Sequence, residues 1–114
     1  MKNRKDLFES REEAIALFEC YKPLLTEEAM RRFEEYYYDD LSLSEMAEIS
    51  SVSRSAIHDA LKNTLEKLSS FEEKLQLAKK RKNIANRLSI YKEAKGEDKE
   101  KALSALLEDI ENAI

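Results

Sequence analysis

Chain breakers are almost absent from this sequence, which holds one glycine, Gly96, and one proline, Pro23, in 114 residues. Long uninterrupted stretches are rich in Glu, Lys, Leu and Ala, residues that favour helices. A chain of this length suits one domain. We therefore expect an all-α protein with a helical bundle in residues 1–70, followed by long C-terminal helices in residues 71–114 that belong to the same structural unit.

The stretch 41–68 has the pattern of two short helices joined by a tight turn. Ser42 is a candidate N-cap, and Glu45 three residues later completes a capping box. The small Ala47 lies where a second helix would cross closely. After the turn, inward-facing side chains recur at helical spacing, at Ile57, Ala60, Leu61, Thr64, Leu65 and Leu68. This pattern is typical of a helix-turn-helix, which we expect over about residues 42–68.

The turn is predicted at residues 50–53. Val52 would fill the space between the two helices as an apolar plug, and Ser53 would cap the second helix. Ser51 occupies the position that most often holds glycine, so a positive φ there would carry some strain.

The second helix is the candidate recognition helix for nucleic acid. Its outward face would carry Arg54, Ser55, His58, Asp59 and Lys62, and three of these form one stripe because Arg54, His58 and Lys62 are four residues apart. The alternative is a helical hairpin inside a bundle, with this polar face only solvated. Glu45 and Glu48 on the first helix would repel a phosphate backbone and count against DNA binding.

Positive charge is concentrated late in a chain whose net charge is −4. Residues 71–96 hold 8 basic and 3 acidic residues, whereas residues 1–53 hold 7 basic and 13 acidic residues. The run 79–82 could bind phosphates of RNA or DNA. It could equally be the solvated face of a long helix, where cations near the C-terminus are favourable. The candidate nucleic-acid-binding residues are therefore Ser53, Arg54, Ser55, His58, Lys62, Lys79, Lys80, Arg81 and Lys82.

Two further helix starts are predicted before the motif, at the capping residues Ser10 and Thr26, with Pro23 ending the first helix or marking the turn after it. Aromatic residues follow, with Phe33 and Tyr37 on the inward face and Tyr36 and Tyr38 beside it. These rings could stack on bases, but aromatic residues at helical spacing usually form core.

The C-terminal stretch has more apolar faces than a small monomeric bundle can cover. Phe71, Leu75, Ala78, Ala85 and Leu88 follow a rough heptad, and Gly96 has the position of a helix C-cap. A last helix is predicted from Leu103, Leu106, Leu107, Ile110 and Ile114. These helices could fold back on the bundle or pack against a second copy of the chain. We expect a homodimer joined mainly through residues 71–114.

Several classes of function are disfavoured. A Walker loop needs two glycines and a dinucleotide fingerprint needs three, while Cys20 and His58 are the only soft metal ligands. We therefore expect no enzyme activity, no cofactor and no metal site.

The longest apolar run, residues 14–18, is too short to span a bilayer. The basic start at residues 1–8 is not followed by an apolar signal segment, so we expect a cytoplasmic protein without membrane insertion.

Three motifs carry a resemblance to a known family: LLT at residues 24–26, YYxDDLSLxE at residues 36–45 and VSRxAI at residues 52–57. Across roughly residues 14–77 the chain resembles the YlxM-like family of small bacterial helix-turn-helix proteins. Met46 and Ser51 depart from the family pattern. The motif is also similar to the promoter-binding region 4 of bacterial sigma factors.

The resemblance implies a DNA- or RNA-binding regulator, because genes of this family lie beside those of the signal recognition particle GTPase and the family is proposed to regulate that pathway. Arg54 falls on the VSR position of the family. The alternative is a protein-interaction module that binds a component of the signal recognition particle without contacting DNA. The acidic residues Asp39, Asp40, Glu45 and Glu48 fit that alternative better.

Overall fold

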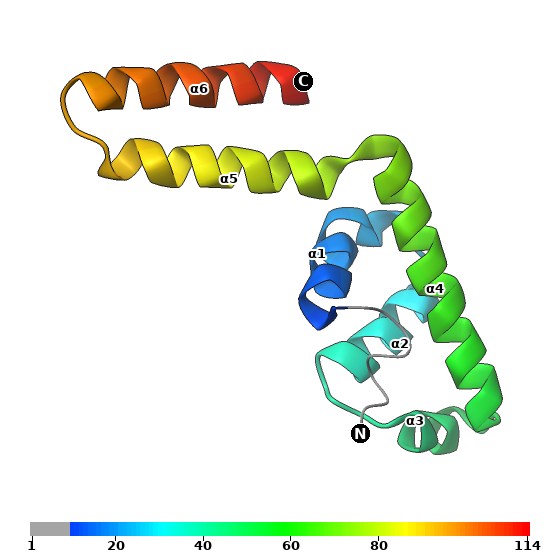
Figure 1. Ribbon diagram of the computed structural model, residues 1–114. Coiled ribbons are helices and arrows are strands. Elements are labelled where there is room, and N and C mark those ends of the chain that lie inside the picture. The colour runs from blue at the N-terminus through cyan, green and yellow to red at the C-terminus, as the bar shows by residue number, and fades with distance from the viewer. Residues whose placement is uncertain (1–9) are drawn as a thin grey trace. The chain divides into compact units, whose positions relative to one another are not determined.

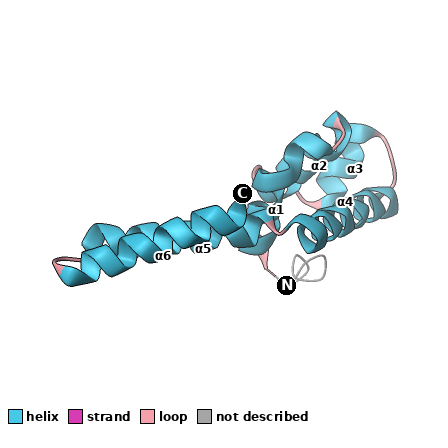
Figure 2. Ribbon diagram, turned by 90° about the horizontal axis from the view of Figure 1, so that it is seen from above, coloured by secondary structure: helices cyan, strands magenta, loops and turns pink. Residues whose placement is uncertain are grey.

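A computed structural model describes residues 10–114, and every regular element in that range is a helix (Figures 1 and 2). The expected all-α fold is confirmed. The basic start predicted at residues 1–8 lies outside the described range. In chain order the elements are α1 (Arg11–Tyr21), the 3₁₀ turn η2 (Lys22–Leu24), α2 (Glu27–Tyr37), α3 (Leu43–Ser50), α4 (Arg54–Leu75), α5 (Leu77–Glu93) and α6 (Glu97–Ala113).

The chain divides into two compact units, Met1–Lys74 and Leu75–Ile114. We call them the N-terminal unit and the C-terminal hairpin. The sequence-based boundary after residue 70 lies four residues earlier, and α4 continues through it without a break. The expectation that the whole chain forms one structural unit stays a prediction.

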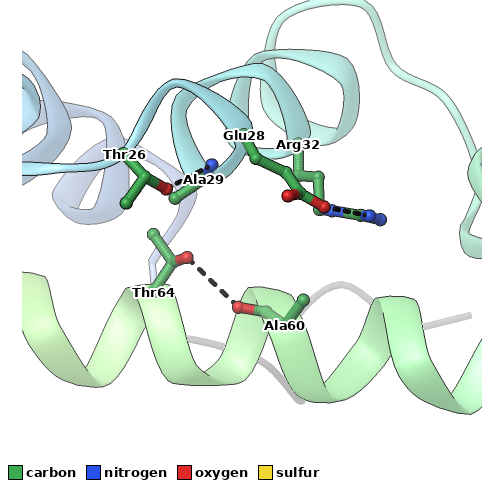
Figure 3. Close-up of polar contacts among 6 residues, drawn as sticks. All are labelled: Thr26, Glu28, Ala29, Arg32, Ala60 and Thr64. Atoms are coloured by element: carbon green, nitrogen blue, oxygen red, sulfur yellow. Dashed lines mark hydrogen bonds and ion pairs between the residues drawn. The ribbon is translucent and has the colours of Figure 1, made fainter.

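Short polar side chains start the first two helices, as predicted. The Ser10 hydroxyl accepts a hydrogen bond of 3.2 Å from the Glu13 N–H, and Thr26 accepts one of 3.1 Å from Ala29 (Figure 3). Each cap satisfies one of the backbone donors that a helix start leaves unpaired. Pro23 lies in η2, so it marks the turn after α1.

Aromatic rings fill the centre of the N-terminal unit. Phe18 of α1 stacks on Phe33 of α2 with 4.1 Å between ring centroids, and Tyr37 stacks on the other side of Phe33 at 4.4 Å. Tyr36, expected beside this face, is buried as well, whereas Tyr38 is exposed. Burial makes this stack core and removes it as a base-stacking platform.

Helix α4 lies beside α1 and α2, the two helices that carry these rings (Figure 1). Its inward stripe is as predicted except for the half-buried Ala60. The one buried polar side chain of this stripe, Thr64, donates a hydrogen bond of 3.1 Å to the Ala60 carbonyl (Figure 3), so its burial leaves no unpaired hydroxyl. The fully covered residues of the stripe are Ile57, Leu61, Thr64, Leu65 and Leu68.

The C-terminal hairpin consists of the antiparallel helices α5 and α6 (Figure 1). Gln76 has φ +55° and separates α4 from α5, so the heptad predicted across residues 71–88 is interrupted. Gly96 was expected as the C-cap of the preceding helix, but α5 ends earlier, at Glu93. Gly96 instead precedes α6 with φ +62° and ψ −134°, a conformation that essentially only glycine adopts.

None of the helices between residues 10 and 114 combines the length and apolar character needed to cross a membrane.

Candidate nucleic-acid interface

The first helix of the motif begins with a complete capping box. The Glu45 N–H donates to the Ser42 hydroxyl at 3.0 Å, and the Ser42 N–H donates to the Glu45 carboxylate at 2.8 Å. The capping box predicted from the sequence is confirmed. Leu43, Met46 and Ala47 of α3 are buried against the rest of the unit.

The turn is closed by backbone hydrogen bonds around a left-handed residue. Ser51 has φ +58° and ψ +41°, as expected, and the Val52 N–H donates to the Ala47 carbonyl at 3.1 Å. The prediction of Val52 as an apolar plug is wrong, because its side chain is 41% exposed. Met46 and Ile57, both 0% exposed, fill the interior on the two sides of the turn instead.

The second helix of the motif, α4, starts at the predicted cap. The Ser53 hydroxyl accepts a hydrogen bond of 3.0 Å from the Ala56 N–H, and the Ser53 carbonyl accepts one of 3.2 Å from Ile57. The N–H groups of Arg54 and Ser55 lie in the first turn of the helix, where no carbonyl of the same helix is available to accept them. This end of α4 therefore presents backbone donors together with the positive end of the helix dipole.

The structure brings the five predicted recognition residues together on the first three turns of α4. Arg54, Ser55 and Lys62 are exposed, while His58 is half-buried. The Asp59 carboxylate Oδ1 lies 3.5 Å from His58 Nδ1.

A shallow groove separates α3 from the start of α4. Its lining combines one guanidinium with two carboxylates and consists of Ser44, Glu45, Ala47, Glu48, Val52 and Arg54. The motif at residues 42–68 holds three Lys or Arg residues and four Asp or Glu residues, so it lacks the strongly positive surface of a non-specific nucleic-acid binder.

The basic run 79–82 belongs to the C-terminal hairpin, so the recognition residues and the run lie in different units. Lys79, Arg81 and Lys82 are exposed and Lys80 is half-buried. The alternative of a solvated helix face fits the exposure of three of these four side chains on the 17-residue α5. Its premise that the run lies near a helix C-terminus is wrong, because α5 starts at Leu77 and the run lies in its first two turns. Cations in the first turn of a helix, here Lys79 and Lys80, are unfavourable by about 0.3–1 kcal/mol each at low ionic strength, and the effect falls off beyond that turn. The helix dipole therefore gives no structural reason for the run.

One surface feature was missed by the sequence interpretation. Ile49 of α3 is 63% exposed and lies three residues before the exposed Val52. The available signal was that Ile49 falls outside the apolar stripe of Leu43, Met46 and Ala47. We call Ile49, Val52, Glu45 and Glu48 the α3 patch. Between residues 10 and 114, no three His, Cys, Asp or Glu side chains gather as metal ligands would.

Comparison with known sequences gives consistent matches. Over residues 8–112 the sequence matches the family described as "Putative helix-turn-helix protein, YlxM / p13 like". It is 42% identical to the UPF0122 protein YlxM of Bacillus subtilis over 98 residues, covering 83% of this chain and 87% of that protein. It is 40% identical to a UPF0122 protein of Clostridium perfringens over 114 residues, covering 92% of this chain and 99% of that protein.

Proposed function

Because this chain belongs to the YlxM / p13-like family of helix-turn-helix proteins, we propose that it is a nucleic-acid-binding regulator without enzymatic activity. One observation carries the proposal. The capped turn places Arg54 at the first residue of α4, exposed, and beside the Ser53 cap. In helix-turn-helix proteins the N-terminal residues of the second helix contact base edges.

Each exposed residue at this end of α4 has a distinct proposed role. The N–H groups of the first turn and the Ser53 hydroxyl would bind one phosphate. Arg54 would bind a phosphate or make a bidentate contact to a guanine edge. Lys62, two turns further on, would contact the backbone, and the run 79–82 would add affinity for phosphates. On duplex DNA, α4 would enter the major groove, as the second helix of a helix-turn-helix does.

The carboxylates of the groove weaken phosphate binding to different degrees. The Glu45 carboxylate accepts a hydrogen bond of 2.8 Å from the Ser42 N–H. This bond holds the negative charge of Glu45 at the start of α3. Glu48 is exposed and lines the groove with Arg54. We therefore expect modest, sequence-dependent binding rather than strong non-specific binding.

We place this regulation in the cytoplasm, in the signal recognition particle pathway. The support is the family resemblance carried by the motifs at residues 24–26, 36–45 and 52–57. The target would be the RNA of the particle or the gene of one of its components.

The α3 patch favours a second candidate function, a protein-interaction module that binds a component of the signal recognition particle. Exposed Ile49 and Val52 beside the carboxylates of Glu45 and Glu48 would suit a partner surface that is both basic and apolar. Such a partner would replace nucleic acid at the motif.

A pull-down from native cells separates the two candidates. The tagged chain is captured with its partners, and one half of each sample is treated with nuclease. The variant Arg54→Ala tests the interface, and Lys67→Ala, another exposed α4 cation, is the matched control. If the chain binds nucleic acid, its partners should be lost after nuclease treatment. They should also be lost with Arg54→Ala but kept with Lys67→Ala. A protein partner that survives nuclease and Arg54→Ala would contradict it and favour the second candidate.

A further inference from the structure

The C-terminal hairpin has too little core to be stable by itself. Within Leu75–Ile114 only Ala102 and Leu106 are buried. Units of about 40 residues usually need a disulfide, a metal or oligomerisation to stay folded. The hairpin therefore needs another surface to cover it.

Two side-chain contacts show which sides of the helices meet. Arg87 of α5 donates a hydrogen bond of 3.1 Å to Asp109 of α6, and the Lys99 ammonium lies 4.9 Å from the centre of the Tyr91 ring. The buried Ala102 and Leu106 fall on the same side of α6 as Asp109 and Lys99. These residues define the line along which α5 and α6 touch.

One face beside this contact line is apolar and open. Leu88 and Leu103 are each 39% exposed and Leu107 is 51% exposed. At 100° per residue, these side chains lie about a quarter turn past the contact line on each helix. On each helix the apolar stripe is rotated from the contact line in the same sense when that helix is viewed from its N-terminus. Because α5 and α6 run antiparallel, the two stripes therefore lie on the same side of the hairpin. We call this side the hairpin face, which consists of Ile84, Leu88, Leu103, Leu107, Ile110 and Ile114.

The two edges of the hairpin face carry opposite charges. Arg81 and Lys92 border it on α5, while Glu100 and Glu111 border it on α6. The contacts Arg87–Asp109 and Tyr91–Lys99 set the register of the hairpin. In that register Lys92 is level with Glu100, near the connecting loop. Arg81 is level with Glu111, near the open end.

We propose that a second copy of this chain covers the hairpin face, with a twofold axis parallel to the helices. That axis places α5 of one copy over α6 of its partner. Each residue keeps its position along the helix direction, so residues at the same level in the two copies face each other. Each cationic edge then meets the anionic edge of the other copy, with Lys92 opposite the partner's Glu100 and Arg81 opposite the partner's Glu111. A twofold axis across the helices would place like charges together, which is unfavourable.

The size of the face suits a dimer of moderate affinity. Helices of 17 residues are about 25 Å long, and two side by side are about 20 Å wide, so each copy would cover about 500 Å². Two copies reach about 1,000 Å², the lower limit of a specific interface. We expect dissociation in the micromolar range.

Sedimentation of the full chain over a concentration series tests the proposal. Leu107→Glu puts a charge in the middle of the face and should weaken the dimer at least tenfold. Ile90→Glu is the matched control, because Ile90 is 55% exposed on the opposite side of α5. Circular dichroism checks that both variants keep their helices. A monomer at every concentration, or equal effects of the two variants, would overturn the proposal.

Charge reversal tests the orientation of the two copies. Lys92→Glu and Glu100→Lys should each weaken the dimer about three- to tenfold, since each contact occurs twice in a symmetric dimer. The double variant restores the opposite charges and should recover most of the affinity. Single variants without effect, or a double variant that is weaker than both, would overturn the arrangement of α5 against α6.

Discussion

The Tyr21 hydroxyl donates a hydrogen bond of 2.6 Å to the Glu72 carboxylate, which joins the last residue of α1 to the final turns of α4. Tyr21 is 1% exposed and its ring lies 5.7 Å from that of Phe71. The contact spans 51 residues of sequence. It holds the end of α4 against the core that carries the start of the same helix, where the candidate recognition residues lie.

Removing this hydroxyl should cost stability because the acceptor is charged and the donor is buried. We expect Tyr21→Phe to lower the free energy of unfolding by about 1–2 kcal/mol, measured by urea denaturation. Tyr38→Phe removes a similar bond, from the Tyr38 hydroxyl to Glu19 at 2.5 Å, but on the surface. It should change stability by less than about 0.5 kcal/mol. Equal losses of stability in the two variants would contradict the expectation that the buried hydrogen bond contributes more than the exposed one.

The aromatic stack should be the most sensitive part of the N-terminal unit. Phe33 is 0% exposed and lies between Phe18 and Tyr37, so Phe33→Ala leaves a cavity and should cost about 3–5 kcal/mol. Ile49→Ala, at 63% exposure, should stay within about 0.5 kcal/mol of the original. Thermal unfolding followed by circular dichroism compares the two. A small loss for Phe33→Ala would contradict its place in the core.

The turn of the motif carries backbone strain that one substitution can relieve. Ser51 at φ +58° costs about 1–2 kcal/mol, while glycine accepts this conformation at a cost in unfolded-state entropy of about 0.5–1 kcal/mol. Ser51→Gly should therefore stabilise the chain by up to about 1 kcal/mol in urea denaturation. Ser50→Gly, one residue earlier and inside α3, is the control and should destabilise it. A loss of stability in Ser51→Gly would contradict the left-handed turn.

The pair Glu28–Arg32 gives a pH-dependent prediction. The 2.6 Å hydrogen bond from the Arg32 guanidinium, aided by its charge, holds the pKa of Glu28 below its ordinary value of 4.5 (Figure 3). A lowered pKa means that this contribution to stability is present above pH 4.5 and is lost as the pH falls through the folded-state value.

We expect Arg32→Gln to raise the pKa of Glu28 back toward its ordinary value, as followed by NMR titration of the side-chain carboxyl. Arg31→Gln is the control and should shift it much less, since Arg31 acts only through its charge. Equal shifts in the two variants would contradict the hydrogen bond as the main cause.

Helix starts could be predicted from sequence because they depend on local chemistry. Ser10, Thr26, Ser42 and Ser53 each accept a backbone N–H within their own first turn. The inward stripe of α4 follows from helical periodicity, and so do the exposed residues on its other side. The same local rules therefore supplied most of the candidate interface.

The errors arose where the backbone conformation has no local signal. Gln76 adopts φ +55° without being glycine, and this break separates α4 from α5 and places the basic run at a helix start. Val52 was assigned to the interior by pattern, but backbone hydrogen bonds already close the turn. Gly96 was assigned to the end of one helix, whereas its positive φ serves the start of the next. A residue with positive φ can either end one helix or precede the next, so the presence of glycine alone does not show which of the two occurs.

The most direct test of the proposed function first selects ligands of the full chain from randomised pools of short duplex DNA and of RNA. The affinity of the chain for the selected DNA and RNA probes is then measured as a function of salt concentration. We expect measurable binding to one of them that weakens as salt rises. Replacing both Arg54 and Lys62 by alanine should weaken binding and lower the logarithmic salt slope by about 1–2, since each lost phosphate contact removes about 0.9. Lys67→Ala should leave the slope nearly unchanged. Absence of binding to both probes, or an unchanged slope in the Arg54 and Lys62 variant, would contradict α4 as the nucleic-acid interface.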